Sequence, residues 1–366
     1  MSKDGNWIPP QHAGIKEKIV QGYLRIWFTR LSSTSSVLSY LDGFAGPGIY
    51  DDGIIGSPIV AMEEAAWALK RHTETYIRLA FIEKNRTIFE KLKKNVENYQ
   101  RNLEKKYGPS VTKRIRVLVE NMDFRYVIET MTFSPWKNRL HPIPSFVFLD
   151  PFGITKSGFS FDWLRTFAER SNVELLLNFY VQGIERNRST ISKERINQIF
   201  GEYIDISNKS VEEIVKWFRN KIRQELNMKV LLYEMRNTRN RILYYLVFIT
   251  KSPEGIKKMK EVMGNLSGKY FYFTNEGHSD QLHLLRHDFP EFQNDFLNRF
   301  AKQEITVDDI FNYYVASDEY IWTEKDIREF LKHLEDDGSI TVKPFKTDGK
   351  KRRKNTFPSN AVIVVL

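Results

Sequence analysis

Residues 39–58 read SYLDGFAGPGIYDDGIIGSP, and this stretch decides the fold class. An apolar run ends at Asp42, and the fourteen residues that follow contain five glycines, at positions 43, 46, 48, 53 and 56. A tight turn needs one glycine or two. Because glycine has no Cβ, a turn this rich in glycine predicts a backbone that comes close to a ligand.

The glycine stretch opens a series of apolar segments that alternate with helical patterns. We expect strands over 37–42, 77–83, 114–123, 146–150 and 173–180, and a hairpin formed by KVLLYEMRN (229–237) and RILYYLVFIT (241–250). Ser57 and Pro58 resemble an N-cap and the first residue of a helix. The pattern predicts an α/β fold with a doubly wound, Rossmann-like sheet that ends in an antiparallel hairpin.

Acidic residues close four of the predicted strands: Asp42, Glu83, Asp123 and Asp150. The carboxyl ends of parallel strands meet at one edge of a sheet, where ligands bind. Packing alone would favour apolar residues at these positions, so the pattern predicts a polar site at this edge.

Composition restricts the possible chemistry. The chain has 366 residues, a formal charge of +10 and no cysteine, which excludes disulfides, cysteine-bound metals and thiol nucleophiles within it. His278, His283 and His287 lack a fourth ligand, so no metal site is predicted. The N-terminal residues have no apolar signal segment, and no run of 18 apolar residues occurs. We expect a cytoplasmic protein with no membrane span.

The C-terminal part differs in pattern from the rest. We expect a large domain over 1–268, a linker over 269–299 and a winged helix-turn-helix domain over 300–366, with two helices and a hairpin that has a basic tip. The basic tip supplies the candidate nucleic-acid-binding residues Lys346, Lys350, Lys351, Arg352, Arg353 and Lys354. The helix after Thr323 mixes acidic and basic residues, so a solvated loop or a protein-binding module remains an alternative.

The order of strand–DGFAGPG, strand–Glu, strand–Asp and strand–DPFG resembles the class I S-adenosylmethionine-dependent methyltransferases. The resemblance implies S-adenosylmethionine as cofactor. It places the cofactor-binding residues at Asp42, Gly43, Phe44, Ala45, Gly46 and Gly48. Glu83 would accept hydrogen bonds from the ribose hydroxyls, and Asp123 would accept one from the adenine amine.

LDPFG (149–153) resembles the motif of N-methyltransferases that act on nucleic-acid bases. The resemblance implies a catalytic set of Asp150, Pro151, Phe152 and Gly153. Asp150 would orient the target amine and Phe152 would stack on the base. Asn178 either lines the same pocket or is a hydrogen-bonded amide at a strand end.

Several longer segments are similar to the three-Cys-motif partner protein family, TcmP. They are HAGIKEKIVQGYLRIWF, LDGFAGPGIYDDGIIGSP, FIEKN, FLDPFG and YLVFITKSPEGIKKM, which span residues 12 to about 263. The family is named for a neighbouring protein with a three-cysteine motif, which would be the partner. His12 and Lys16 match its N-terminal pattern, and Lys16 would neutralise the carboxylate of the cofactor.

Two functions follow as alternatives. The first is an S-adenosylmethionine-dependent N-methyltransferase that acts on a base of RNA or DNA and works with the three-Cys-motif protein. The second is a cofactor-binding partner or regulator that transfers no methyl group and holds nucleic acid through its winged helix. A nucleotide-sugar or NAD enzyme is disfavoured, because the loop 49–57 departs from the compact G-x-G-x-x-G turn.

Overall fold

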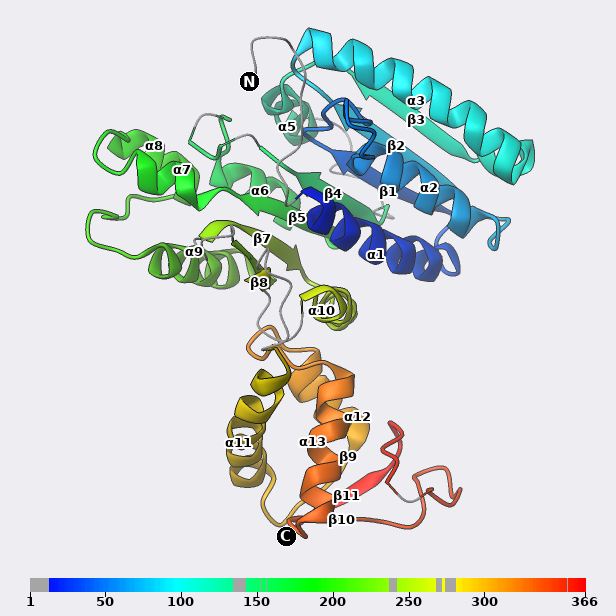
Figure 1. Cartoon of the computed structure of the whole chain (residues 1–366), viewed down its shortest axis with the longest axis vertical. Coiled ribbons are helices and arrows are strands. Elements are labelled where there is room, and N and C mark those ends of the chain that lie inside the picture. The colour runs from blue at the N-terminus through cyan, green and yellow to red at the C-terminus, as the bar shows by residue number, and fades with distance from the viewer. Residues whose placement is uncertain are drawn as a thin grey trace. The chain divides into compact units, whose positions relative to one another are not determined.

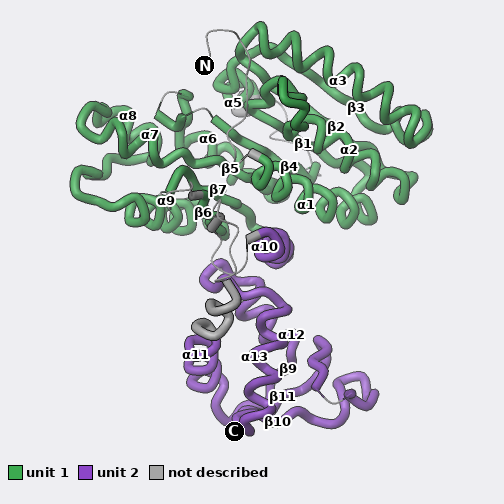
Figure 2. The backbone as a smooth tube through the Cα atoms, in the orientation of Figure 1, with its two compact units in different colours: residues 1–251 green, residues 252–366 purple. Residues whose placement is uncertain are grey.

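The chain forms two compact units in a computed structural model, residues 1–251 and 252–366 (Figure 2). The structure describes residues 13–133, 143–151, 153–155, 157–236, 242–267, 272–273, 281–353 and 355–366. Each unit is described by itself below.

The first unit is built on a mostly parallel sheet (Figure 1). Its strands are β1 (Val37–Asp42), β2 (Tyr76–Ile82), β3 (Ile115–Glu120), β4 (Ser145–Leu149), β5 (Val173–Phe179), β6 (Lys229–Arg236) and β7 (Ile242–Thr250). Their order is β3-β2-β1-β4-β5-β7-β6, and β7 runs antiparallel to both of its neighbours. The predicted α/β sheet with its antiparallel hairpin is therefore confirmed.

Helices cover both faces of this sheet. They are α1 (Ala13–Ser32), α2 (Ser57–Leu69), α3 (Arg86–Tyr107), α4 (Pro109–Thr112), α5 (Phe124–Phe133), α6 (Phe161–Ala168), α7 (Val181–Arg186), α8 (Lys193–Phe200) and α9 (Val211–Leu226). On one face, Tyr23 and Trp27 of α1 contact the ring of Phe146 in β4. On the other face, Phe218 of α9 stacks on Phe179 of β5, with 4.4 Å between ring centroids. Burial on both faces explains why the parallel strands are almost continuously apolar.

Two local predictions were wrong. Strand β3 ends at Glu120, so Asp123 lies beyond the strand, just before α5. Gly56, and not Ser57, is the N-cap of α2. The Ser57 hydroxyl donates a hydrogen bond to Asp42 at 2.6 Å instead, which supplies a donor to a completely buried carboxylate.

The second unit has its own core. Its elements are α10 (Pro253–Ser267), β8 (Tyr272–Phe273), α11 (Gln281–Phe300), β9 (Glu304–Thr306), α12 (Val307–Ile310), the π-helix η2 (Phe311–Val315), α13 (Glu324–Asp336), β10 (Ile340–Val342) and β11 (Val362–Val365). Strands β10, β11 and β9 form an antiparallel sheet in that order. Thr306 with Asp309 and Thr323 with Asp326 form capping boxes, which the three-residue spacing of Thr and Asp in the sequence predicts.

The compact units divide at a different place from the predicted domain boundaries. Helix α10 groups with the second unit, where the buried Lys260 ammonium donates to the carbonyls of Tyr314 and Ser317. Helix α11 occupies much of the segment 269–299 that was expected to be a linker, and it buries Phe292 and Phe296. No helix in the described part of the chain is long and apolar enough to cross a membrane.

Candidate functional site

The glycine turn follows β1, where the strand order reverses between β1 and β4. Gly46 and Gly48 have φ angles of +61° and +75°, which side chains other than glycine rarely adopt. A Cβ on Gly43 would lie 2.8 Å from side-chain atoms of Leu149 and Phe124. Close packing therefore requires glycine at 43, and backbone conformation requires it at 46 and 48.

Glu83 binds the glycine turn from the end of β2. Its Oε2 accepts a hydrogen bond from the backbone N–H of Gly46 at 3.1 Å, and its Oε1 accepts one from Asn85 at 2.7 Å. Burial raises the pKa of Glu83 above its usual value. A carboxylate can accept about four hydrogen bonds, so Glu83 keeps acceptor capacity beside the backbone N–H groups that it binds.

Asp42 is completely buried at the end of β1. It accepts hydrogen bonds from the Ser57 hydroxyl and from the backbone N–H of Phe44, the latter at 3.2 Å. Burial raises the pKa of Asp42 to about 7. Ala45, the next residue of the turn, donates its N–H to the carbonyl of Ile82 at 2.9 Å. Asp42 thus ties the glycine turn to the start of α2.

Asp123 is bound by cations. Its carboxylate accepts hydrogen bonds from Arg125 and forms an ion pair of 2.7 Å with Lys84. The hydrogen bond from Arg125 lowers the pKa of Asp123 well below its usual range. This carboxylate therefore belongs to a surface charge cluster, in which any adenine amine would compete with two cations.

Asp150 follows β4 and joins two other site residues. One carboxylate oxygen forms an ion pair with the ammonium of Lys16, and the other accepts from Nδ2 of Asn178 at 2.6 Å. Burial lowers the pKa of Lys16, but the charges of Asp150 and Glu17 outweigh it, so that pKa stands well above its usual value. In the DPFG motif, Pro151 is buried and Gly153 has a φ of +68°.

Glu17 is a member of this cluster that sequence reasoning missed. Its Oε1 lies 3.7 Å from the Lys16 ammonium, and burial raises its pKa to about 7 although Lys16 opposes that shift. Glu17 Oε2 and Asn178 Oδ1 are buried and have no hydrogen-bond partner among the described residues. In the sequence, the available signal for Glu17 was that it is charged and directly follows Lys16 on the same helix.

Three tyrosines border the cluster. The charges of Lys16 and Asp150 act on Tyr50, Tyr180 and Tyr244, and burial raises the pKa of all three phenols. The rings of Tyr180 and Tyr244 stack, with centroids 5.2 Å apart. The sequence did not predict that these tyrosines lie together, because Tyr244 is on β7 and Tyr50 is in the glycine stretch, far apart in the chain.

The structure therefore brings Asp42, Glu83, Asp150 and Lys16 to one edge of the sheet. The predicted basic residues lie in the second unit. His12, Phe152, Lys354 and His278 lie outside the described residues. Among the residues that are described, no group of three or more His, Asp or Glu side chains has a geometry that could hold a metal ion.

Comparison with known proteins adds little to this geometry. No protein-family model and no curated protein matches the sequence. Protein LPL1258 from Legionella pneumophila superposes with a TM-score of 0.37 and 14% identity, over 69% of this chain and 92% of its own. An O-methyltransferase family protein from Burkholderia thailandensis gives 0.30 and 12%, over 66% of this chain and 57% of its own.

The plantazolicin methyltransferase BpumL, solved in complex with SAH, also gives 0.30, with 8% identity over 66% of this chain and 86% of its own. Likenesses this low carry no argument about activity. The strand order itself, with its single inserted antiparallel strand and its flanking helices, resembles the class I methyltransferase Rossmann-like fold.

Proposed function

We propose that the protein is an S-adenosylmethionine-dependent N-methyltransferase that acts on a base of RNA or DNA. The observation that carries this proposal is the arrangement at the carboxyl edge of β1, β2 and β4. There a glycine turn is bound by Glu83, beside Asp150 held between Lys16 and Asn178.

The residues present fit the cofactor. Glu83 retains acceptor capacity at the end of β2, where a ribose diol would lie. Glu17 Oε2 and Asn178 Oδ1 are buried acceptors with no donor among the described residues, and an unsatisfied buried polar atom is costly. A ligand with amino groups would supply these donors, and Lys16 would attract its carboxylate.

The chemistry follows from these positions. When bound, the cofactor supplies an electrophilic methyl group. Asp150 would accept a hydrogen bond from the exocyclic amine of the base and so aim its nitrogen lone pair at that group, with orientation supplying much of the rate. The ion pair with Lys16 holds the Asp150 carboxylate in position for this purpose. Carboxylates near the amine would assist loss of its proton.

The nucleic-acid part of the proposal rests on DPFG and on the second unit. We propose that α11, α12 with η2, α13 and the sheet β10-β11-β9 form a winged helix whose wing is the segment between β10 and β11. Lys350, Lys351 and Arg353 are exposed there and suit phosphate contacts. Arg352 differs, because its guanidinium pairs with Glu335 and its side chain is 7% exposed. We expect the ion pair of Arg352 with Glu335 to anchor the wing to α13.

Calorimetric titration with S-adenosylmethionine and S-adenosylhomocysteine tests the cofactor site. We expect micromolar binding that weakens at least tenfold in Glu83→Gln, which keeps one acceptor for the glycine turn but removes the charge that binds the diol. Glu90→Gln on α3, where the carboxylate pairs with exposed Arg86, is the matched control. If neither compound binds, the proposal is refuted for the protein without a partner.

A second candidate is the cofactor-binding partner of a three-Cys-motif protein that transfers no methyl group. It is favoured by one observation: both carboxylate oxygens of Asp150 already have partners, as in a structural ion pair. Transfer of labelled methyl groups into RNA and DNA separates the two. Asp150→Asn should abolish transfer and retain cofactor binding if the residue orients an amine. Binding without any transfer by the wild type would favour the partner role.

A further inference from the structure

A small hairpin stands out within the segment that joins β10 to β11. Phe345 forms an antiparallel bridge with Lys351, and the N–H of Lys346 donates to the carbonyl of Lys350 at 3.0 Å. Gly349 closes the turn with a φ of +78°, and Asp348 accepts the backbone N–H of Lys350. The hairpin therefore has a defined turn and fixes which side chains lie beside each other.

Phe345 is exposed on this hairpin, with 57% of its surface accessible. A single exposed aromatic residue is ordinary and indicates nothing alone. Phe345, however, has lysines for neighbours: Lys351 is its bridge partner and Lys346 follows it in the chain. An aromatic ring set among cations is the combination that binds single-stranded nucleic acid.

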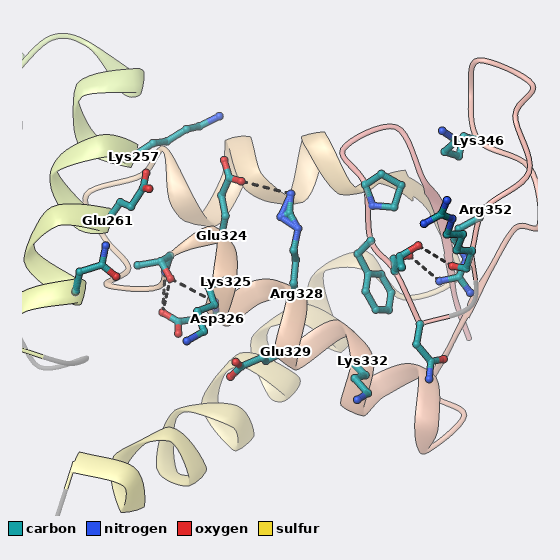
Figure 3. A pocket seen from close by; sticks show the side chains of 18 of the residues that line it. Lys257, Glu261, Glu324, Lys325, Asp326, Arg328, Glu329, Lys332, Lys346 and Arg352 are labelled. Atoms are coloured by element: carbon teal, nitrogen blue, oxygen red, sulfur yellow. Dashed lines mark hydrogen bonds and ion pairs between the residues drawn. The ribbon is translucent and has the colours of Figure 1, made fainter. Parts of the chain in front are cut away.

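The same hairpin forms one wall of a cleft within the second unit. The other walls come from α10 and α13, and Figure 3 shows Lys257, Arg328 and Lys346 extending from these three elements. The cleft has a volume of about 1270 Å³, which exceeds the roughly 300–1,000 Å³ of small-molecule pockets. Its size and openness suit a polymer that passes through it.

Charge in the cleft is predominantly positive. Nine Lys or Arg side chains and four Asp or Glu side chains line it. Glu324 pairs with Arg328 at 3.4 Å, and Glu261 pairs with Lys258 at 2.9 Å. The remaining cations include the exposed residues Lys325, Lys332, Lys351 and Arg353. They border the cleft on two sides, as contacts to successive phosphates require.

We infer that this cleft binds an unpaired strand of nucleic acid, with its phosphates on the cations and one base stacked on Phe345. The inference rests on the proposed nucleic-acid substrate and deepens it. Bases in a duplex present only their edges, because each face is covered by the next pair. Phe345 does not itself line the cleft, but its bridge partner Lys351 and its chain neighbour Lys346 do, so its exposed ring lies on the hairpin that borders the cleft. Stacking on this ring needs an unstacked base, which RNA and single-stranded DNA both offer.

An anionic lipid surface would also attract a phenylalanine flanked by lysines. The shape of the site disfavours it, because a flat bilayer reaches the rim of a cleft and not the cations inside it. Arg328 and Lys257 lie on the walls, where a flexible strand can contact them (Figure 3). Lipid binding is therefore an outcome of the test.

Fluorescence anisotropy with the full chain tests the inference. A labelled oligonucleotide, as DNA and as RNA, is compared with its duplex over a series of salt concentrations. We expect tighter binding of the single strand. Phe345→Ala should weaken single-strand binding about tenfold without changing the salt slope, because stacking releases no counterion. Lys351→Ala should instead reduce the slope by about one.

Tyr203→Ala is the matched control, since Tyr203 is an aromatic residue with 50% exposure in the first unit. Its variant should bind like the wild type, and thermal unfolding should show that all variants are folded. Equal loss of single-strand and duplex binding in Phe345→Ala would overturn the inference. Binding to phosphatidylserine vesicles with none to oligonucleotides would overturn it as well.

These measurements need no cofactor, so they fail or succeed separately from the proposed enzyme activity. A protein that binds single strands through Phe345 and transfers no methyl group would leave this inference standing and remove the proposed reaction. If Phe345→Ala changes neither methyl transfer nor oligonucleotide affinity, the proposed reaction stands and this inference is refuted.

Discussion

At the scale of single residues, the site is defined by how charges are buried. Lys16 and Glu17 are neighbours on α1 and are 8% and 7% exposed. A buried charge must be paired or neutralised. Lys16 is paired by Asp150, whereas Glu17 keeps an oxygen with no hydrogen-bond partner among the described residues. Burial therefore favours the protonated form of Glu17 in the folded protein.

A pH-dependent stability follows for Glu17. Burial raises its pKa to about 7 from 4.5, so between these values the folded protein holds a proton that the unfolded chain has lost. This contribution to stability is present at low pH and is lost as pH rises toward 7. Relative to the wild type, Glu17→Gln should gain about 2 kcal/mol between about pH 5 and about pH 7.5.

Urea unfolding at a series of pH values measures this difference. Glu90→Gln, which changes an exposed carboxylate on α3, should follow the wild type at every pH. Parallel stability curves for wild type and Glu17→Gln would show that Glu17 is ionised normally in the folded protein.

At the scale of elements, the glycine turn is a rigid connection between β1 and α2. The Gly48 carbonyl accepts from Gly56 at 2.7 Å, so the loop closes on itself before the helix begins. Asp42 and Glu83 hold the start of the loop by its backbone N–H groups. The conformation of this loop therefore depends on glycine and on two acidic strand ends together.

Alanine at Gly48 should be costly. Its φ of +75° disfavours a side chain, and a Cβ would lie 3.1 Å from a methyl group of Leu92. We expect a loss of about 2 kcal/mol in the free energy of unfolding and weaker binding of S-adenosylhomocysteine. Gly14→Ala in α1 is the control, since a Cβ there meets nothing within 4 Å and should stabilise the helix by about 0.5 kcal/mol. Equal stabilities of the two variants would contradict this account of the turn.

At the scale of the whole molecule, the described residues form separate hydrophobic cores in the two units. In the first unit, a core lies between one face of the sheet and helices α5, α6, α7, α8 and α9. In the second unit, a core lies around Phe292, Tyr314 and Phe330. Units with separate cores can unfold in separate transitions.

Differential scanning calorimetry tests this separation. S-adenosylhomocysteine at a hundred times its Kd should stabilise one transition by about 2.7 kcal/mol and leave the other unchanged. Ile327→Ala, at a fully buried position of α13, should lower the Tm of the other transition, because such a cavity costs about 2–5 kcal/mol. A single transition that responds to both changes would show that the units unfold together.

Local patterns in the sequence determined the class of fold. Apolar runs alternated with helical patterns because parallel strands are buried on both faces, and the glycines after Asp42 marked the first turn. Capping pairs at Thr306 and Thr323 were also readable, because a cap involves residues only three positions apart. Each of these signals lies within a short window of the chain.

The tertiary structure decided which polar groups meet. Lys16 pairs with Asp150 across 134 positions, and Asn178 and Tyr244 come from later strands, so no local pattern reveals the cluster. It also placed α10 in the second unit, where α10 forms one wall of the basic cleft. Sequence specifies elements through nearest neighbours, whereas the charge, burial and accessibility of a site depend on groups that only folding brings together.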